Sequence, residues 1–146
     1  MKLYLMRHGQ AASPQIDPEQ GLTTEGRAEV EQLAKRLATK GVHFDQVFHS
    51  DKARAQQTAA IMAAQIPTTH APKLRSGLKP NDDPRPLLAE IDHWQADTLI
   101  VSHLPFVPGL IALLTVDTDF MAMIPATIVC LSKEGELWHI EWVESP

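Results

Sequence analysis

The chain has 146 residues, of which 44% are apolar and 21% charged, and its formal net charge is −5. This length and composition predict one globular domain over residues 1–146. The acidic balance excludes the broadly basic surface of a nucleic-acid-binding protein, so no nucleic-acid partner is expected. The apolar stretch around 107–116 contains a proline and is too short to span a bilayer, so no membrane partner is expected either.

Apolar spacing and helix-boundary residues indicate two strand–helix units in the first half of the chain. The first helix starts near a threonine, a favoured N-cap residue, and its apolar residues recur at helical spacing until Gly41 stops it. The second helix is rich in alanine and ends before Pro67. In chain order, the predicted elements are a strand at 2–6, a helix from about Thr24 to Gly41, a strand at 46–49 and a helix at 52–65.

The second half begins with an irregular stretch, residues 68–86, which holds four of the eleven prolines. Its predicted elements are, in chain order, a small strand at 73–75, a helix at 87–94, a strand at 98–102, a helix at 107–114, and strands at 126–132 and 136–143. Trp138 and Trp142 stand four residues apart in the last strand, so they are predicted to share one face of the sheet.

The alternation of strands with helices predicts an α/β fold. We expect a three-layer sandwich with a mostly parallel central sheet and helices on both faces. The last two strands are joined by a short turn at Glu134-Gly135, so they are expected to form an antiparallel edge. Ligands of such folds bind at the carboxyl ends of the parallel strands, which is where the chemically distinctive residues of this chain fall.

Arginine and histidine side chains follow three of the predicted strands. Arg7 and His8 come directly after the first strand, Arg54 lies four residues beyond Ser50, and His103 follows a later strand. Ionised arginine is rarely buried without a partner, so an anion, and phosphate in particular, is the expected ligand. We therefore expect Arg7, His8, Arg54 and His103 to converge on one rim. Ser50 and the serine before His103 are interpreted as turn or capping residues.

These residue types suit phosphoryl transfer without a metal ion or other cofactor. Neutral His8 can attack phosphorus through one ring nitrogen. Because Arg7 and Arg54 disfavour its protonated form, the pKa of His8 is expected to fall. The two arginines and His103 would bind the phosphoryl oxygens as charge shifts during the transfer. The spacing typical of a zinc site and the oxygen clusters typical of magnesium are not evident.

The chain resembles the histidine phosphatase (phosphoglycerate mutase-like) superfamily in four ordered motifs. They are Arg7-His8-Gly9, the helix-opening segment LTTEGRA at 22–28, Ser50-x-x-x-Arg54-Ala55-x-x-Thr58, and Ser102-His103 after an apolar strand. The small size and the strings RAQQT and SHLP are most similar to the compact branch, the SixA-type phosphohistidine phosphatases. The resemblance implies that His8 is the phosphorylated nucleophile and that Arg7, Arg54 and His103 form the phosphate pocket.

Two departures from the family pattern concern the neighbourhood of the leaving group. Asp51 follows Ser50 where many relatives have proline. The segment between Thr58 and Leu99 is short, and in larger relatives this region carries the acid that protonates the leaving group. The candidate acids in this segment, none of them in a recognisable motif, are Asp82, Asp83, Glu90 and Asp92.

A phosphorylated imidazole needs no dedicated acid, because it can take up a proton and leave as neutral imidazole. We therefore expect a protein-phosphohistidine phosphatase that forms and then hydrolyses phospho-His8, with a phosphotransfer domain or a phosphocarrier protein as partner. Two alternatives stay open: a small-molecule phosphomonoesterase of the same superfamily, and a phosphoprotein-binding module without turnover. The single cysteine, Cys130, fits a reducing compartment, so a cytoplasmic location is expected. A monomer is expected because no long apolar edge or heptad pattern stands out.

Overall fold

The computed structural model describes residues 1–117 and 119–146, and its centre is a six-stranded sheet in the order β3-β2-β4-β1-β5-β6. The strands are β1 (Lys2–Arg7), β2 (Gln46–His49), β3 (Lys73–Leu74), β4 (Thr98–Ser102), β5 (Ile128–Glu134) and β6 (Leu137–Glu144). Neighbours among the first four are parallel, whereas β5 and β6 form an antiparallel edge. The predicted sheet is confirmed.

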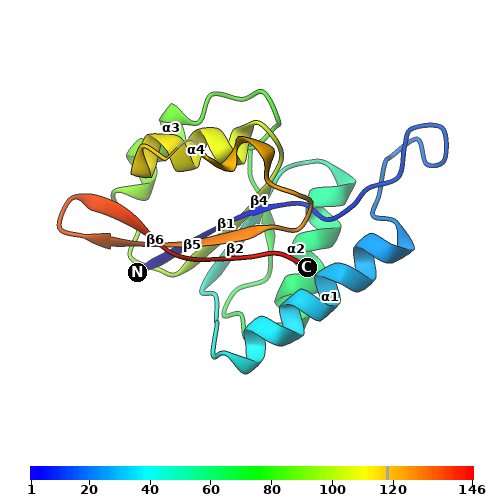
Figure 1. Cartoon of the computed structure of the whole chain (residues 1–146), viewed down its shortest axis with the longest axis horizontal. Coiled ribbons are helices and arrows are strands. Elements are labelled where there is room, and N and C mark those ends of the chain that lie inside the picture. The colour runs from blue at the N-terminus through cyan, green and yellow to red at the C-terminus, as the bar shows by residue number, and fades with distance from the viewer. Residues whose placement is uncertain (118) are drawn as a thin grey trace.

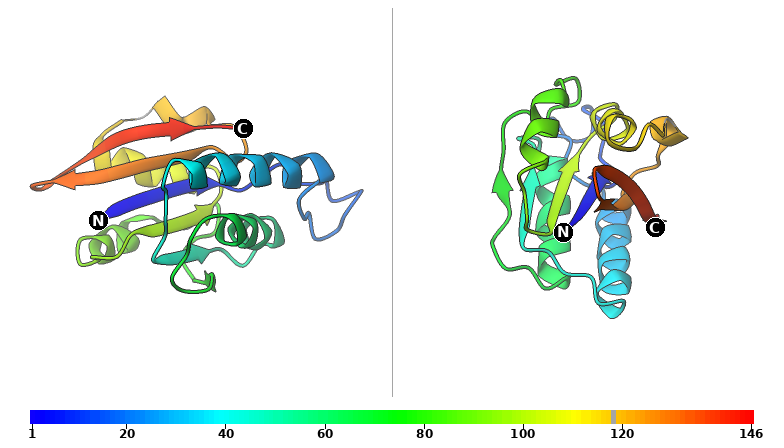
Figure 2. Two further views of the ribbon diagram at one scale, coloured as in Figure 1. Left: turned by 90° about the horizontal axis from the view of Figure 1, so that it is seen from below. Right: turned by 90° about the vertical axis from the view of Figure 1, so that its left-hand side faces the viewer.

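Helices cover both faces of the sheet (Figure 1). One face carries α1 (Thr24–Thr39) and α2 (Ala53–Gln65), and the other carries α3 (Arg85–Ile91) and α4 (Phe106–Thr115). Figure 2 shows the three layers from two further directions, which confirms the predicted α/β sandwich. A short 3₁₀ helix, η1 (Asp119–Ala122), was not predicted and joins α4 to β5. Among the described residues, every helix is too short or too polar to cross a membrane.

Alternating side chains of the central strands feed two apolar cores. Tyr4 and Met6 of β1 point into the core under α1 and α2, whereas Leu3 and Leu5 point into the core under α3 and α4. All four are almost fully buried. This alternation follows from the two-residue period of a strand, and burial on both faces explains why β1 is apolar throughout.

The loop after β1 packs directly on the first turn of α1. The hydroxyl of Thr23 caps the helix by accepting the Gly26 N–H at 2.9 Å, so α1 begins at Thr24 as predicted. The Thr23 N–H donates to the Gln10 carbonyl at 3.0 Å. A Cβ at Gly26 would lie 2.3 Å from the same oxygen, so only glycine allows this approach. The helix therefore holds the chain that follows the Arg7-His8 pair.

The two tryptophans of β6 lie on opposite faces of the sheet, so the prediction of a shared face was wrong. Trp142 packs on Tyr4, with ring centroids 5.9 Å apart, whereas Trp138 belongs to the core under α3 and α4. The cause is a shift in register: Cys130 pairs with Trp142, but the next residue of β5 pairs with Ile140. The extra residue in β6 reverses the alternation of side chains, as a β-bulge does.

Candidate functional site

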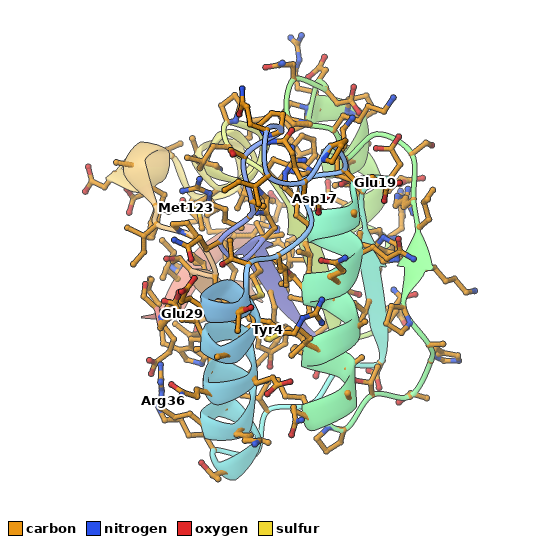
Figure 3. All side chains as sticks on the ribbon, turned by 90° about the vertical axis from the view of Figure 1, so that its right-hand side faces the viewer. Tyr4, Asp17, Glu19, Glu29, Arg36 and Met123 are labelled. Carbon is orange, nitrogen blue, oxygen red and sulfur yellow. The ribbon has the colours of Figure 1, made fainter. Side chains whose placement is uncertain are left out.

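His8 lies at the edge of the sheet where β1, β2 and β4 end. Its backbone N–H donates to the carbonyl of Ser102 at the end of β4, and its carbonyl accepts the N–H of Ala126, both at 3.0 Å. The backbone of His8 is therefore fixed between β4 and the segment that leads into β5. Figure 3 looks onto this edge, with Met123 to one side and Asp17 and Glu19 to the other.

The structure brings His103 beside His8, as predicted. The two ring centroids are 5.0 Å apart and the planes are tilted by 57°. Only 9% of His8 and 2% of His103 is exposed to solvent. The closeness follows from the sheet, because Arg7 and Ser102 are paired residues of the neighbouring strands β1 and β4, so the residues after them emerge side by side.

The two arginines complete the group. The Nη1 atom of Arg7 donates to the carbonyl of Met123 at 2.8 Å. Its buried Nε has no hydrogen-bond partner among the described residues. Arg54 lies in the first turn of α2, and its charge lowers the pKa of both His8 and His103. The contact of Arg7 and the charge effects of Arg54 indicate that all four side chains lie in one neighbourhood, and their binding of phosphate stays a prediction.

The surroundings of His8 keep its imidazole neutral. Burial, followed by the charges of Arg54 and Arg7, lowers its pKa to about 4, while the Gly9 carbonyl acts in the opposite direction. The direction was predicted, but burial, not the arginines, is the largest cause. The Nδ1 atom lies 2.7 Å from the Gly9 carbonyl oxygen, which can only accept, so Nδ1 carries the proton. The Nε2 lone pair is then free to act as a nucleophile.

His103 is neutral for similar reasons. Burial lowers its pKa to about 3, with further contributions from His8, Arg54 and Lys52, whereas the Asp51 carboxylate opposes the shift. At neutral pH it is therefore an uncharged imidazole with a single N–H.

Sequence reasoning missed the contacts of two hydroxyl groups with this site. The Oγ atom of Ser50 lies 2.6 Å from Nε2 of His103. The Oγ1 atom of Thr58 accepts the Gly9 N–H at 3.0 Å and donates to the Arg54 carbonyl at 2.8 Å. Both residues belong to the Ser50–Thr58 motif, which was the available signal. The Ser102 hydroxyl instead donates to the Leu78 carbonyl, as expected for a structural residue.

None of the four candidate general acids acts on the pKa of His8 or His103. Among the described residues, their polar contacts are with Lys79 for Asp82, Arg85 for Asp83, Arg75 for Glu90 and Lys133 for Asp92. Asp92 lies at the edge of the sheet opposite His8. Its partner Lys133 follows Ser132, and Ser132 pairs with Lys2 at the start of β1. The carboxylate that acts on His103 is that of Asp51.

One group among the described residues could hold a metal ion, and it lies far from His8. The side-chain ligand atoms of His43, Asp45 and Asp97 are all within 4.8 Å of one another. Asp45 and Asp97 directly precede β2 and β4, at the edge of the sheet opposite His8. A hollow of about 300 Å³ beside them has Tyr4 and Trp142 in its wall. The group therefore has no part in the site described above.

The fold and the paired buried histidines define an α/β protein with a polar site at the carboxyl ends of its parallel strands. A model of the histidine phosphatase superfamily (branch 1) matches residues 3–77, a range that contains His8 and Arg54. The chain belongs to this superfamily, and phosphatase activity is what its relatives support.

The relatives differ in how much of their length the chain spans. The structure is similar to that of the protein histidine phosphatase SixA complexed with tungstate: TM-score 0.86, 27% identity, 99% of this chain and 97% of that chain. A protein of Picosynechococcus sp. is 37% identical over 112 residues, which are 72% of this chain and 67% of that protein. The mitochondrial serine/threonine-protein phosphatase PGAM5 of Mus musculus is 28% identical over 101 residues, 66% of this chain but only 33% of PGAM5.

Proposed function

We propose that the protein is a protein-phosphohistidine phosphatase that works through a phosphorylated His8. The observation that carries the proposal is the charge around His8. Among the described residues, the side-chain charges that shift its pKa are those of Arg54 and Arg7, both cations. The Asp51 carboxylate acts on His103 and lines the rim, whereas His8 itself is under the influence of cations. Such a site suits a leaving group that needs no acid from the enzyme.

The leaving group decides between a phosphoester and a phosphoramidate substrate. An alcohol leaves as a strongly basic alkoxide unless an acid protonates it, and the four candidate acids are engaged elsewhere. A phosphorylated imidazole can take a proton from solvent on its other nitrogen before the P–N bond breaks, and it then leaves as neutral imidazole. The tungstate-bound SixA relative, named a protein histidine phosphatase, supports the same substrate class.

The proposed reaction has two steps at one position. The Nε2 lone pair of His8 forms a bond to phosphorus as the P–N bond to the substrate histidine breaks. Water then attacks the phosphorus of phospho-His8, which releases inorganic phosphate and restores the neutral imidazole. Arg7, Arg54 and the N–H of His103 would bind the phosphoryl oxygens throughout, and such electrostatic stabilisation is the main source of catalysis in phosphoryl transfer.

The rim around the site supports a protein as substrate. One hollow of about 340 Å³ is lined by Glu19, Asp51, Lys52 and Gln56. A second, of about 300 Å³, lies on the other side of Asp51 along the 74–82 loop. Since His8 is only 9% exposed, the phosphohistidine side chain would have to enter the recess while its own protein rests on this open rim.

The test compares wild-type protein, His8→Ala and His70→Ala on a ³²P-labelled histidine phosphocarrier protein. His70 is exposed and serves as the matched control. We expect the wild type and His70→Ala to release phosphate, and brief reaction quenched in alkaline denaturant, in which phosphohistidine survives, to leave label on the wild-type chain. Equal phosphate release by wild type and His8→Ala would contradict the proposal.

Further substrates in the same assay separate the alternatives. Faster turnover of p-nitrophenyl phosphate or of a phosphoserine peptide than of the phosphohistidine protein would favour a phosphomonoesterase. The second of these substrates is included because PGAM5 is named a serine/threonine-protein phosphatase. Stable binding of the phosphoprotein without release of phosphate would favour a binding module.

A further inference from the structure

The Ser50 hydroxyl and the His103 ring form a short, fully enclosed contact. The Oγ–Nε2 distance is 2.6 Å, and Ser50 and His103 are 1% and 2% exposed. We propose that Ser50 is a positioning residue, which holds His103 in the tautomer that carries its proton on Nδ1 and so presents a neutral N–H donor to the phosphoryl group. The proposal rests on the phosphatase function proposed above.

Counting donors and acceptors assigns the proton in this contact. A serine hydroxyl has one hydrogen to donate and can accept two. The other contact of Ser50 Oγ is the backbone N–H of Lys52 at 3.3 Å, which is also a donor. If Nε2 of His103 carried a proton, the hydroxyl hydrogen would have no acceptor among the described residues. The hydroxyl therefore donates to Nε2, and the ring proton lies on Nδ1.

The Nδ1 atom is the free polar atom of this ring. It is buried and has no hydrogen-bond partner among the described residues. A buried donor without an acceptor is unfavourable, and such groups are typical of sites where a ligand supplies the partner. The buried Nε of Arg7 likewise has no hydrogen-bond partner among the described residues. Two unpartnered donors near His8, whose ring centroid is 5.0 Å from that of His103, fit the oxygens of a phosphoryl group.

The neutral state of His103 is what makes its tautomer matter. An imidazolium donates from both nitrogens, but burial and the nearby Arg54 and Lys52 keep this ring uncharged at neutral pH. With the proton on Nδ1, this nitrogen presents an N–H that attracts a phosphoryl oxygen. With the proton on Nε2, Nδ1 would present a lone pair, which repels the oxygen. One hydroxyl group thus decides whether His103 supports or opposes phosphate binding.

The tautomer can be read without any substrate. In ¹⁵N-histidine-labelled wild-type protein at pH 7, we expect Nδ1 of His103 to be protonated and Nε2 to be unprotonated, with the signals assigned by comparison with His103→Asn. Ser50→Ala should populate the Nε2–H form, and Ser50→Thr, which keeps a hydroxyl, should restore the wild-type pattern. Ser102→Ala is the matched control, because its buried hydroxyl donates to the Leu78 carbonyl and not to an imidazole.

The same variants are then assayed on the phosphorylated carrier. We expect Ser50→Ala to lower kcat/KM by about tenfold or more, the effect of one lost interaction in the transition state, and Ser50→Thr to recover most of it. Wild-type His103 protonated on Nε2 would overturn the inference, as would a Ser50→Ala variant with unaltered tautomer and kcat/KM. Wild-type protein with the expected tautomer but no turnover would instead contradict the proposed function alone.

Discussion

The hydroxyl of Thr58 accepts the backbone N–H of Gly9 at 3.0 Å, and this bond joins α2 to the residue directly after His8. Thr58 is fully buried, so the N–H has no access to water as a substitute partner. The same hydroxyl donates to the Arg54 carbonyl at 2.8 Å. One side chain therefore links the backbone of the nucleophile to the helix turn that carries an arginine of the site.

Thr58→Val removes this hydroxyl while keeping the shape of the side chain. We expect the free energy of unfolding to fall by about 1–3 kcal/mol, because the Gly9 N–H is left buried and unpaired. Urea denaturation measures the loss. Thr58→Ser keeps the hydroxyl and should lose clearly less. If valine and serine variants are equally stable, the Gly9 bond makes no net contribution.

Gly26 carries a second prediction about the loop behind His8. A Cβ at this position would lie 2.3 Å from the Gln10 carbonyl oxygen, which is backbone and cannot move aside on its own. Gly26→Ala should therefore lower the free energy of unfolding by about 1–3 kcal/mol, as overpacking does, and displace the Arg7-His8-Gly9 loop. Thermal unfolding and turnover of a phosphohistidine protein would report the two effects.

Gly109→Ala is the matched control for the Gly26 variant. Gly109 lies inside α4, and a Cβ there would meet nothing within 4 Å. Alanine is favoured over glycine in a helix by about 0.5–1 kcal/mol, so this variant should be as stable as the wild type or more so. A Gly26→Ala variant that matches Gly109→Ala in stability would show that the Gln10 backbone moves aside without a cost in the free energy of unfolding.

Most of the sheet could be predicted because its strands are short apolar runs bounded by polar residues. The predicted strands at 46–49 and 98–102 coincide with β2 and β4. Sequence could also predict that one edge of the sheet gathers Arg7, His8, Arg54 and His103, since parallel strands end at the same edge. What sequence could supply was therefore the element order and the residues that each element brings to that edge.

The remaining features depend on contacts that no local pattern records. Ala126 has a φ of 63°, a conformation rare for alanine, and its N–H bonds to His8, so β5 starts two residues later than expected. The register shift beside Cys130 separates Trp138 from Trp142. The role of burial in the pKa of His8 required the packed structure. Each of these is a consequence of tertiary packing.

The buried histidines His8 and His103 predict how stability depends on pH. Their pKa values, about 4 for His8 and about 3 for His103, lie below the ordinary value of 6.5, so the unfolded chain binds protons first. Their contribution is complete above pH 6.5, declines as the pH falls, and is lost below pH 4 for His8 and pH 3 for His103. Between pH 7 and 5, His8 alone should account for about 2 kcal/mol.

Urea denaturation of wild type and His8→Asn at pH 7 and pH 5 measures this contribution. The variant should lose less stability than the wild type on acidification, by about 2 kcal/mol. Carboxylates titrate alike in both proteins and cancel in the comparison. His70→Asn alters an exposed histidine and should behave as the wild type. Parallel losses in wild type and His8→Asn would mean that His8 titrates normally in the folded protein.

The charge of Arg54 should be measurable in the titration of His8. Burial is the largest cause of the lowered pKa of His8, and Arg54 makes the largest contribution among the charged side chains. Arg54→Gln should therefore raise the pKa of His8 from about 4 towards, but not to, its ordinary value, as followed by NMR of the ring protons. Arg27→Gln removes an exposed charge on α1 and should leave the pKa unchanged.

Turnover separates the two consequences of losing Arg54. In the Arg54→Gln variant His8 is still neutral at pH 7, so the nucleophile remains available. We nevertheless expect phosphohistidine turnover to fall by about a hundredfold or more, because a charge that would bind the phosphoryl oxygens is missing. The loss should persist at every pH where the protein is folded. Recovery of wild-type turnover at higher pH would mean that Arg54 acts through the protonation of His8 and not on the phosphoryl group.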